Sequence, residues 1–290
     1  MEKRDEKRNR SYEGLLFGTA GVPLSAPKRD SIEGIRFLKK LGLDAMEMEF
    51  VRGVKMKEEQ AKEVGRVRLE EGKELTAHGP YYINLNSRDK EIIEKSIERI
   101  VRTAWIAHLC GAKSITFHAA YYLGMDKGKV YENVKNAIQR IIEELKRIGA
   151  DDVWIRPELT GKPTQFGDID ELIKLSEEVE GVLPCIDFSH NFARTLGKFN
   201  SKEAFDSFLE KMKKELGESV LSNMHCHISG IEYGPKGEKN HLNLRDSKLR
   251  IRELLQALKE FRCKGIVICE SPNIEEDAIY MKELYNNIKQ

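Results

Sequence analysis

The chain of 290 residues is long enough to bury one large core, so its length does not require two domains. Its 49 basic and 48 acidic residues give a formal net charge of +1, which excludes a protein whose whole surface is basic and coats nucleic acid. Any surface that contacts nucleic acid must therefore be local.

The N-terminal residues and the cysteines bear on the cellular compartment. Acidic and basic residues alternate from Met1 to Arg10, which predicts a solvated tail over residues 1–12 ahead of one domain over residues 13–290. No apolar run reaches the ~18 residues of a membrane span, and the N-terminus lacks a signal-type apolar segment. The five cysteines are odd in number and lack CxxC spacing, which argues against a disulfide framework. We expect a monomeric, cytoplasmic protein with no membrane contact.

Short β-rich runs recur along the chain, and each is followed by a longer amphipathic stretch. The runs predict strands at Leu15–Ala20, Ala45–Phe50, Glu74–His78, Ser114–His118, Val153–Glu158, Leu183–Asp187, Ser222–Ile228 and Gly265–Glu270. The stretches predict helices at Ser31–Leu41, Lys57–Glu71, Asp89–Cys110, Lys127–Ile148, Ile169–Val179, Lys202–Leu216, Asp246–Phe261 and Ile274–Lys289. This alternation predicts an α/β fold, a single (β/α)₈ barrel.

The competing architecture is an open, doubly wound sheet that binds a nucleotide. Such a sheet calls for a glycine-rich phosphate loop after its first strand. The segment from Phe17 to Pro23 contains two glycines but lacks the G-x-G-x-x-G spacing. The barrel is therefore the better interpretation.

Residue types that bind metals stand at the ends of the predicted strands. They are His78, His118, Glu158, Asp187, His190, His225, His227 and Glu270. The ends of parallel barrel strands surround one mouth, where so many imidazoles and carboxylates would repel one another and lose solvation unless cations neutralised them. A single histidine at a strand end is more often a hydrogen-bonded structural residue, so the inference rests on the group. Mixed imidazole and carboxylate donors favour Zn²⁺, with Mn²⁺ or Fe²⁺ next.

Two motifs carry a family resemblance. The segment from Thr76 to Leu85, T-A-H-G-P-Y-Y-I-N-L, resembles the H-x-x-Y-x-I-N-L segment of endonuclease IV, and Cys185 to His190 resembles that family's C-I-D-x-x-H. Members are apurinic/apyrimidinic endonucleases that cleave the phosphodiester 5′ to an abasic site with a trinuclear zinc cluster. The resemblance implies a zinc-dependent endonuclease of base excision repair, with damaged double-stranded DNA as its partner and two or three Zn²⁺ per chain.

The resemblance also implies roles for individual residues. Glu158 would bridge two metals and, with Glu270, stand at the catalytic centre, Glu158 also orienting the nucleophile. The remaining ligands would be His78 and His118 for one metal, Asp187, Glu270 and either His225 or His227 for the next, and His190 and His241 for the third. His227 is the slightly better match on the seventh strand, and the other histidine would then lie one layer deeper.

One position departs from the family pattern. The family has an aspartate two residues before the histidine that corresponds to His241, and this chain has Lys239 there, preceded by Glu238. The third metal would then be weakly held, held by Glu238, or missing.

Contacts to DNA are expected from Tyr81 and Tyr82, which occupy the loop where the family inserts side chains into the damaged duplex, and from Arg52. Aromatic rings could fill the gap left by a flipped nucleotide. The alternative is that the tyrosines pack this loop against the rim of the barrel.

Two other functions stay open. One is a metal-dependent sugar isomerase or epimerase of the xylose isomerase-like barrel superfamily, which gathers similar ligands but does not require His190 and His241. The other is a metal-binding barrel that binds nucleic acid without cleaving it, which Lys239 keeps possible.

Overall fold

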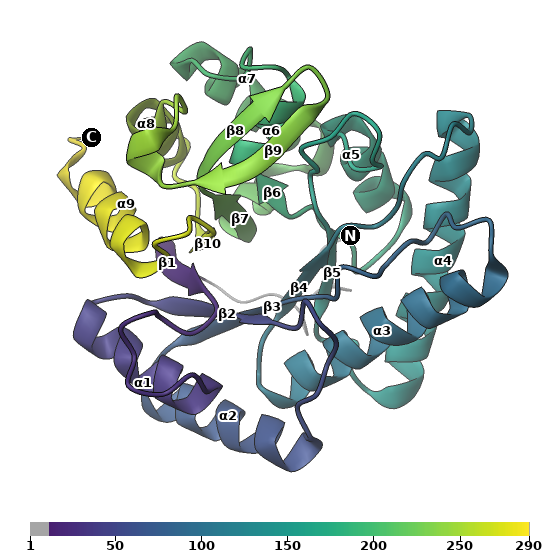
Figure 1. Ribbon diagram of the computed structural model, residues 1–290, viewed down its shortest axis with the longest axis horizontal. Helices are drawn as coiled ribbons and strands as arrows, with labels where there is room; N and C mark the ends of the chain where they lie inside the picture. The colour runs from purple at the N-terminus through teal and green to yellow at the C-terminus, as the bar shows by residue number, and fades with distance from the viewer. Residues whose placement is uncertain (1–11, 290) are drawn as a thin grey trace. The chain divides into compact units, whose positions relative to one another are not determined.

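The protein is described by a computed structural model that covers residues 12–289, so the predicted tail lies outside the described residues except for Tyr12. Strands and helices alternate along the chain in the order expected of a (β/α)₈ barrel (Figure 1). The chain divides into two compact units. The first contains residues 47–160 and 164–185, and the second contains the described residues up to 46, residues 161–163 and those from 186 onward.

Four parallel strands form the sheet of the first unit. Their order is β2 (Ala45–Glu49, of which the last three residues belong to this unit), β3 (Glu74–His78), β4 (Ser114–Phe117) and β5 (Trp154–Pro157). The segment that precedes residue 186 runs parallel to β5 through isolated bridges at Val182 and Cys185. The helices are α2 (Glu58–Glu70), α3 (Lys90–Leu109), α4 (Lys127–Ile148) and α5 (Ile169–Glu178), with α3 beside α4 (Figure 1).

Local sequence explains where these helices begin and end. Asp126 caps α4 by accepting a hydrogen bond from the Lys129 amide, and Gly149 ends it in the left-handed conformation that glycine adopts without strain. Asp168 and Glu171 form a capping box at the start of α5. Such caps satisfy backbone groups that the helix leaves unpaired, so the helix bounds follow from the chain itself.

The second unit contains the other parallel strands in the order β1 (Leu15–Ala20), β10 (Gly265–Cys269), β7 (Met224–Ile228) and β6 (Ile186–Asp187). An antiparallel hairpin, β8 (Gly230–Gly234) and β9 (Gly237–Leu242), follows β7 and contacts α6 (Figure 1). The helices are α1 (Ser31–Leu41), α6 (Phe188–Arg194), α7 (Lys202–Leu216), α8 (Ile251–Glu260) and α9 (Glu275–Asn287), with 3₁₀ turns η1 (Glu218–Ser222) and η2 (Leu244–Asp246).

The predicted elements all occur, and α1, α4 and α7 have the predicted bounds. Other bounds differ, among them that of β6, which was predicted over Leu183–Asp187 and extends only over Ile186–Asp187. The predicted helix over Asp246–Phe261 begins only at Ile251, because η2 takes up the first residues. Neither α6 nor the β8–β9 hairpin was predicted from the sequence. The first is too short to show helical periodicity, and the second carries polar residues on both faces.

A membrane-spanning helix requires a long apolar stretch. Across residues 12–289, every helix falls short of the length or the hydropathy that such a span needs.

Candidate metal centre

The first ligand cluster lies in the first unit and consists of His78, His118 and Glu158, which end β3 or directly follow β4 and β5. The Oε2 atom of Glu158 lies 3.1 Å from Nε2 of His78, and its Oε1 atom lies 3.4 Å from Nε2 of His118. One potential ligand atom from each residue lies within 4.8 Å of the other two. The three strand ends therefore bring together two imidazoles and a carboxylate, as the sequence predicted.

The ring of His78 is oriented by its second nitrogen. Nδ1 lies 2.8 Å from the carbonyl oxygen of Gly79, to which it donates, so Nε2 faces Glu158. A histidine ligand whose other nitrogen donates to a backbone carbonyl is fixed in tautomer and direction. This arrangement suits His78 to bind a metal through Nε2.

The charge state of His78 depends on neighbouring carboxylates. Burial by itself lowers the pKa of the imidazole, but the hydrogen bond to Glu158 and the charges of Glu158, Glu49 and Glu47 outweigh it and raise this pKa to about 10. Without a metal, His78 is therefore an imidazolium at neutral pH. A metal cation would take the place of that proton.

Glu47 and Glu49 were not singled out from the sequence. Glu47 is fully buried on β2 and accepts a hydrogen bond from the Thr76 hydroxyl at 2.7 Å. Both carboxylates lie close enough to His78 to raise its pKa. The signal was present in the run Ala45–Phe50, A-M-E-M-E-F, where strand alternation places the two glutamates on one face of an otherwise apolar strand.

The second cluster lies in the second unit and consists of Asp187, His227 and Glu270, which also offer ligand atoms within 4.8 Å of one another. Asp187 and His227 are partners in the register of β6 and β7, and Nδ1 of His227 lies 3.3 Å from Oε1 of Glu270. His225 is buried two residues earlier on β7, with its ring 5.1 Å from that of His227 between centroids, and does not belong to this cluster.

Asp187 also determines where His190 lies. Its Oδ1 atom accepts a hydrogen bond from the His190 amide at 2.7 Å and so caps α6, while Oδ2 lies 3.1 Å from Nδ1 of the same histidine. A single carboxylate thus contributes to the second cluster and orients the first histidine of the next.

The third cluster consists of His190 on α6 and of Glu238 and His241 on β9. Nε2 of His190 lies 3.6 Å from Oε2 of Glu238, and the two imidazole rings are 5.6 Å apart between centroids. Nδ1 of His241 lies 3.1 Å from the carbonyl oxygen of Glu270, which orients that ring. The hairpin therefore brings a carboxylate and a second imidazole to His190.

A β-bulge explains why Glu238, and not Lys239, faces the histidines. Glu232 pairs with Asn240 and Tyr233 pairs with Glu238, so Lys239 is the extra residue of β9. An extra residue shifts the alternation of side chains by one position. Lys239 is half-exposed and forms an ion pair with Glu232 at 3.1 Å. The residue that departs from the family pattern thus lies outside the cluster.

The loop after β5 passes against this cluster at Gly161. A Cβ atom at that position would lie 2.6 Å from Cβ and 2.7 Å from Oε2 of Glu238, and 3.1 Å from Cδ2 of His190. The Gly161 carbonyl accepts a hydrogen bond from the Glu238 amide at 3.0 Å. Close backbone approach therefore holds Glu238 in position and requires glycine.

The candidate DNA contacts lie in the first unit. Tyr81 and Tyr82 are 65% and 56% exposed, so neither is packed into a core. The Tyr81 ring is 6.0 Å from that of His78, and the guanidinium of Arg99 lies over the Tyr82 ring at 5.7 Å. Arg52 is exposed. The two rings are thus exposed, and each also has a neighbour in this unit, so both the DNA contact and the packing of the loop against the rim stay open.

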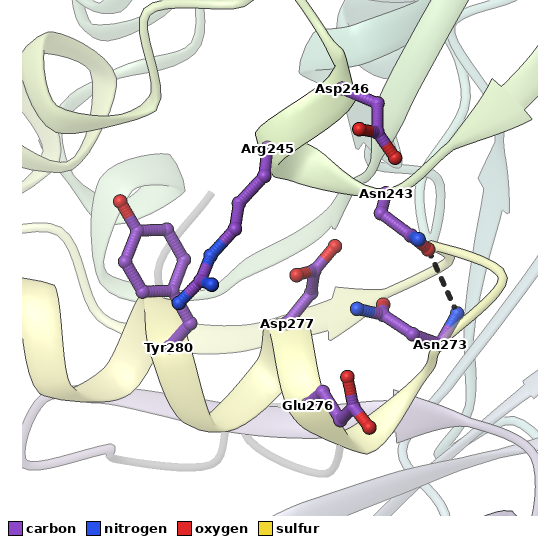
Figure 2. A pocket seen from close by; sticks show the side chains of 7 residues that line it. All are labelled: Asn243, Arg245, Asp246, Asn273, Glu276, Asp277 and Tyr280. Atoms are coloured by element: carbon purple, nitrogen blue, oxygen red, sulfur yellow. Dashed lines mark hydrogen bonds between the residues drawn. The ribbon is translucent and has the colours of Figure 1, made fainter.

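A separate pocket of about 250 Å³ lies in the second unit between η2 and the start of α9 (Figure 2). Its polar groups largely fasten these segments together, since Asp277 accepts from the Leu244 amide at 2.6 Å and Asn243 from the Asn273 amide at 3.2 Å. None of the cluster ligands lines this pocket, whose walls are Asn243, Arg245, Asp246, Asn273, Glu276, Asp277 and Tyr280. These bonds hold the segment that follows β9, and the pocket lies apart from the candidate ligands.

The chain matches known proteins along most of its length. Residues 35–286 match the family described as xylose isomerase-like TIM barrel, which confirms the predicted fold. An uncharacterized protein of Methanocaldococcus jannaschii is 48% identical over 94% of this chain and 98% of its own. A probable endonuclease 4 of Persephonella marina is 24% identical over 57% of this chain, and apurinic-apyrimidinic endonuclease 1 of Plasmodium falciparum is 26% identical over 74%. These matches span 58% and 36% of the two nucleases.

Solved structures of two kinds share the fold. Endonuclease IV from Thermus thermophilus superposes with a TM-score of 0.68 at 18% identity, covering 92% of this chain and 97% of that one. A D-tagatose 3-epimerase-like protein gives 0.70 at 18% identity, with 93% and 96% covered. Because a nuclease and an epimerase-like protein fit about equally well, the likeness establishes the fold and leaves the reaction to the site residues.

Proposed function

Because the chain belongs to the xylose isomerase-like TIM barrel family, whose members share a fold but not one reaction, we propose a function from its ligand clusters. The protein is a zinc-dependent endonuclease that hydrolyses the DNA phosphodiester on the 5′ side of an abasic site, in base excision repair. Relatives named as endonuclease 4 and as apurinic-apyrimidinic endonuclease support the proposal.

The third cluster is the observation that carries this proposal. A sugar isomerase or epimerase of this fold needs one carboxylate-rich metal site and a base beside a carbonyl, and His190, Glu238 and His241 are superfluous to it. Three clusters, each with imidazole and carboxylate donors within 4.8 Å, instead suit a reaction that uses several cations.

The donor chemistry fits Zn²⁺, since each of these three clusters combines imidazole with carboxylate and lacks a thiolate. When bound, zinc ions would lower the pKa of a water molecule, neutralise the phosphate and stabilise the leaving oxygen. The chain's own residues hold these positions: Glu158 fixes His78 and His118, and Asp187 fixes His190. That Glu158 also bridges two metals, orients the nucleophile and acts together with Glu270 stays a prediction of the resemblance, as does the choice of His227 over His225.

DNA contact is proposed for Tyr81, Tyr82 and Arg52. The exposed tyrosines stand three and four residues after His78 in the chain, so rings that filled the gap at an abasic site would hold the damaged backbone near the first cluster.

The proposal is tested by offering the zinc-loaded protein three substrates in parallel. These are a duplex with one abasic analogue, the same duplex without damage, and a free ketohexose. We expect cleavage of the abasic duplex alone. Epimerisation of the ketose without cleavage of either duplex would establish the rival function.

Two matched variants connect that activity with the third cluster. Glu238→Gln should lose most of the cleavage, because it weakens a ligand that faces His190. Lys239→Ala should retain it, because Lys239 points to Glu232. Wild-type activity in both variants would show that the third cluster takes no part in the reaction.

A further inference from the structure

Besides Tyr81 and Tyr82, the first unit exposes apolar side chains in the loop that follows β4. Tyr121 and Leu123, in the loop after β4, are each 41% exposed. We propose that Tyr121 and Leu123 contact the bases next to an abasic site and form a second contact loop beside Tyr81 and Tyr82. The inference rests on the proposed function and adds residues that determine its specificity.

The two loops are joined by hydrogen bonds. The side chain of Asn86, only 1% exposed, donates to the Tyr121 carbonyl at 2.8 Å, and the Leu85 amide donates to the Ala119 carbonyl at 2.9 Å. The Asn84 side chain accepts from the Tyr121 amide at 3.5 Å. The loops that follow β3 and β4 are therefore held side by side, and their exposed side chains keep a fixed separation.

The loop after β5 holds the other edge of the same segment. Tyr121 pairs with Gln165 in an antiparallel bridge, and the Tyr122 amide donates to the Thr164 carbonyl at 3.1 Å. The Tyr122 side chain is buried, and its hydroxyl lies 2.7 Å from a carboxylate oxygen of Glu171. Tyr122 thus anchors the loop, while the side chains before and after it lie at the surface.

Leu123 occupies a backbone conformation that leucine normally avoids. Its φ of 53° is in the left-handed region, which costs a residue with a Cβ on the order of 1 kcal/mol. Folding would be served better by glycine at this position, and an exposed leucine side chain adds no core packing. Strained residues cluster at functional sites, which makes Leu123 a candidate for binding.

The residues around these exposed side chains favour nucleic acid as the partner. Arg99 donates to the Tyr82 carbonyl at 3.2 Å and lies over its ring, and Arg88 donates to the Leu123 carbonyl at 3.2 Å. Bonds to carbonyls leave the positive charge of both guanidinium groups available to phosphates. Flat rings and an aliphatic side chain flanked by arginines suit stacked bases and their backbone.

The test measures the dissociation constants of the zinc-loaded protein for the abasic duplex and for the intact duplex. Tyr121→Ser should weaken binding of the abasic duplex at least about fivefold, the lower end of the loss of one stacked base, and reduce the preference over intact duplex. Leu123→Gly should also weaken it, while its thermal unfolding temperature stays unchanged or rises because the strain is relieved. A substitution that acted only through the fold would lower the thermal unfolding temperature together with the affinity.

Leu69→Ala is the control, because Leu69 is an exposed leucine in α2, away from both loops in the chain. It should leave the affinity for the abasic duplex unchanged. If wild type cleaves the abasic duplex and both loop variants bind it as tightly as wild type, the second contact loop is wrong. If wild type neither binds nor cleaves it, the proposed function fails and this inference fails with it.

Discussion

Glu158 holds the first cluster together, because its two carboxylate oxygens face different imidazoles. Oε2 lies 3.1 Å from Nε2 of His78, and Oε1 lies 3.4 Å from Nε2 of His118. The carboxylate is 1% exposed, so its charge must be balanced locally, by protons or by a cation. In the metal-free protein the proton on His78 provides that balance.

The metal-free protein should therefore lose stability as the pH rises from 6.5 to about 10. Burial lowers the pKa of His78, but Glu158, Glu49 and Glu47 raise it from 6.5 to about 10, so over this interval the folded protein keeps a proton that the unfolded chain has released. The stabilisation is complete below the unfolded pKa and is lost through the folded one, at a slope on the order of 1 kcal/mol per pH unit. Urea unfolding in EDTA at neutral and alkaline pH measures this slope.

His78→Gln is the control for that prediction, because it removes the titrating imidazole. Its free energy of unfolding should depend less on pH over the same interval. A wild-type protein whose stability rose with pH there would contradict the raised pKa.

The candidate ligands could be found from sequence because parallel strands end at the same edge of a sheet, so polar residues at strand ends attract attention. Glu49 also stands at a strand end, but Glu47 and Glu49 were not recognised as site residues because their neighbours in the run are apolar. The orientation of Lys239 could not be predicted, because it depends on one extra residue in a hairpin whose register is set by the fold.

At the scale of elements, α6, the β8–β9 hairpin and the loop after β5 together build the third cluster. The bulge in β9 directs Glu238 toward His190, and the backbone of Gly161 packs against both side chains. Both features belong to the backbone: the extra residue in β9 and the close approach of Gly161. The geometry of this cluster therefore depends on the path of the backbone as much as on the ligands.

Gly161→Ala should remove about one metal per chain. The new methyl group would lie within 3.1 Å of His190 and closer still to Glu238, so one of these side chains must move. The fold should persist, because the Glu238 side chain is only partly buried and can shift away from the new methyl group. Metal analysis of purified protein measures the loss. Gly14→Ala is the control, since a methyl group there meets nothing within 4 Å, and it should retain the wild-type metal content.

The helices were predicted well where the chain carries its own start and stop signals. Asp30 and Gly42 bound α1, and Asp126 and Gly149 bound α4, at the predicted residues. The α6 helix could not be recognised in this way, because its N-cap, Asp187, is also the last residue of a strand. Elements that depend on tertiary contacts, such as this helix and the hairpin, could not be recognised from local pattern alone.

At the scale of the whole molecule, the alternation of strand and helix was sufficient to predict the barrel, and the family match over residues 35–286 confirms it. The reaction does not follow from the fold, since endonuclease IV and an epimerase-like protein have TM-scores of 0.68 and 0.70 with this chain. The choice between them depends on the third cluster and on the exposed tyrosines. Both are features of the loops that follow the strands, where function varies on a constant barrel.

The most direct test of the proposed nuclease is to map the bond that it cuts. A duplex with one abasic analogue, labelled separately at each end of the damaged strand, is incubated with zinc-loaded protein, with the EDTA-treated protein, and with Glu158→Gln. The account predicts a single cut on the 5′ side of the abasic position, abolished by EDTA, restored by Zn²⁺ and reduced at least about a hundredfold in Glu158→Gln. Intact strands with zinc-loaded wild-type protein, or cleavage that EDTA leaves unchanged, would contradict it.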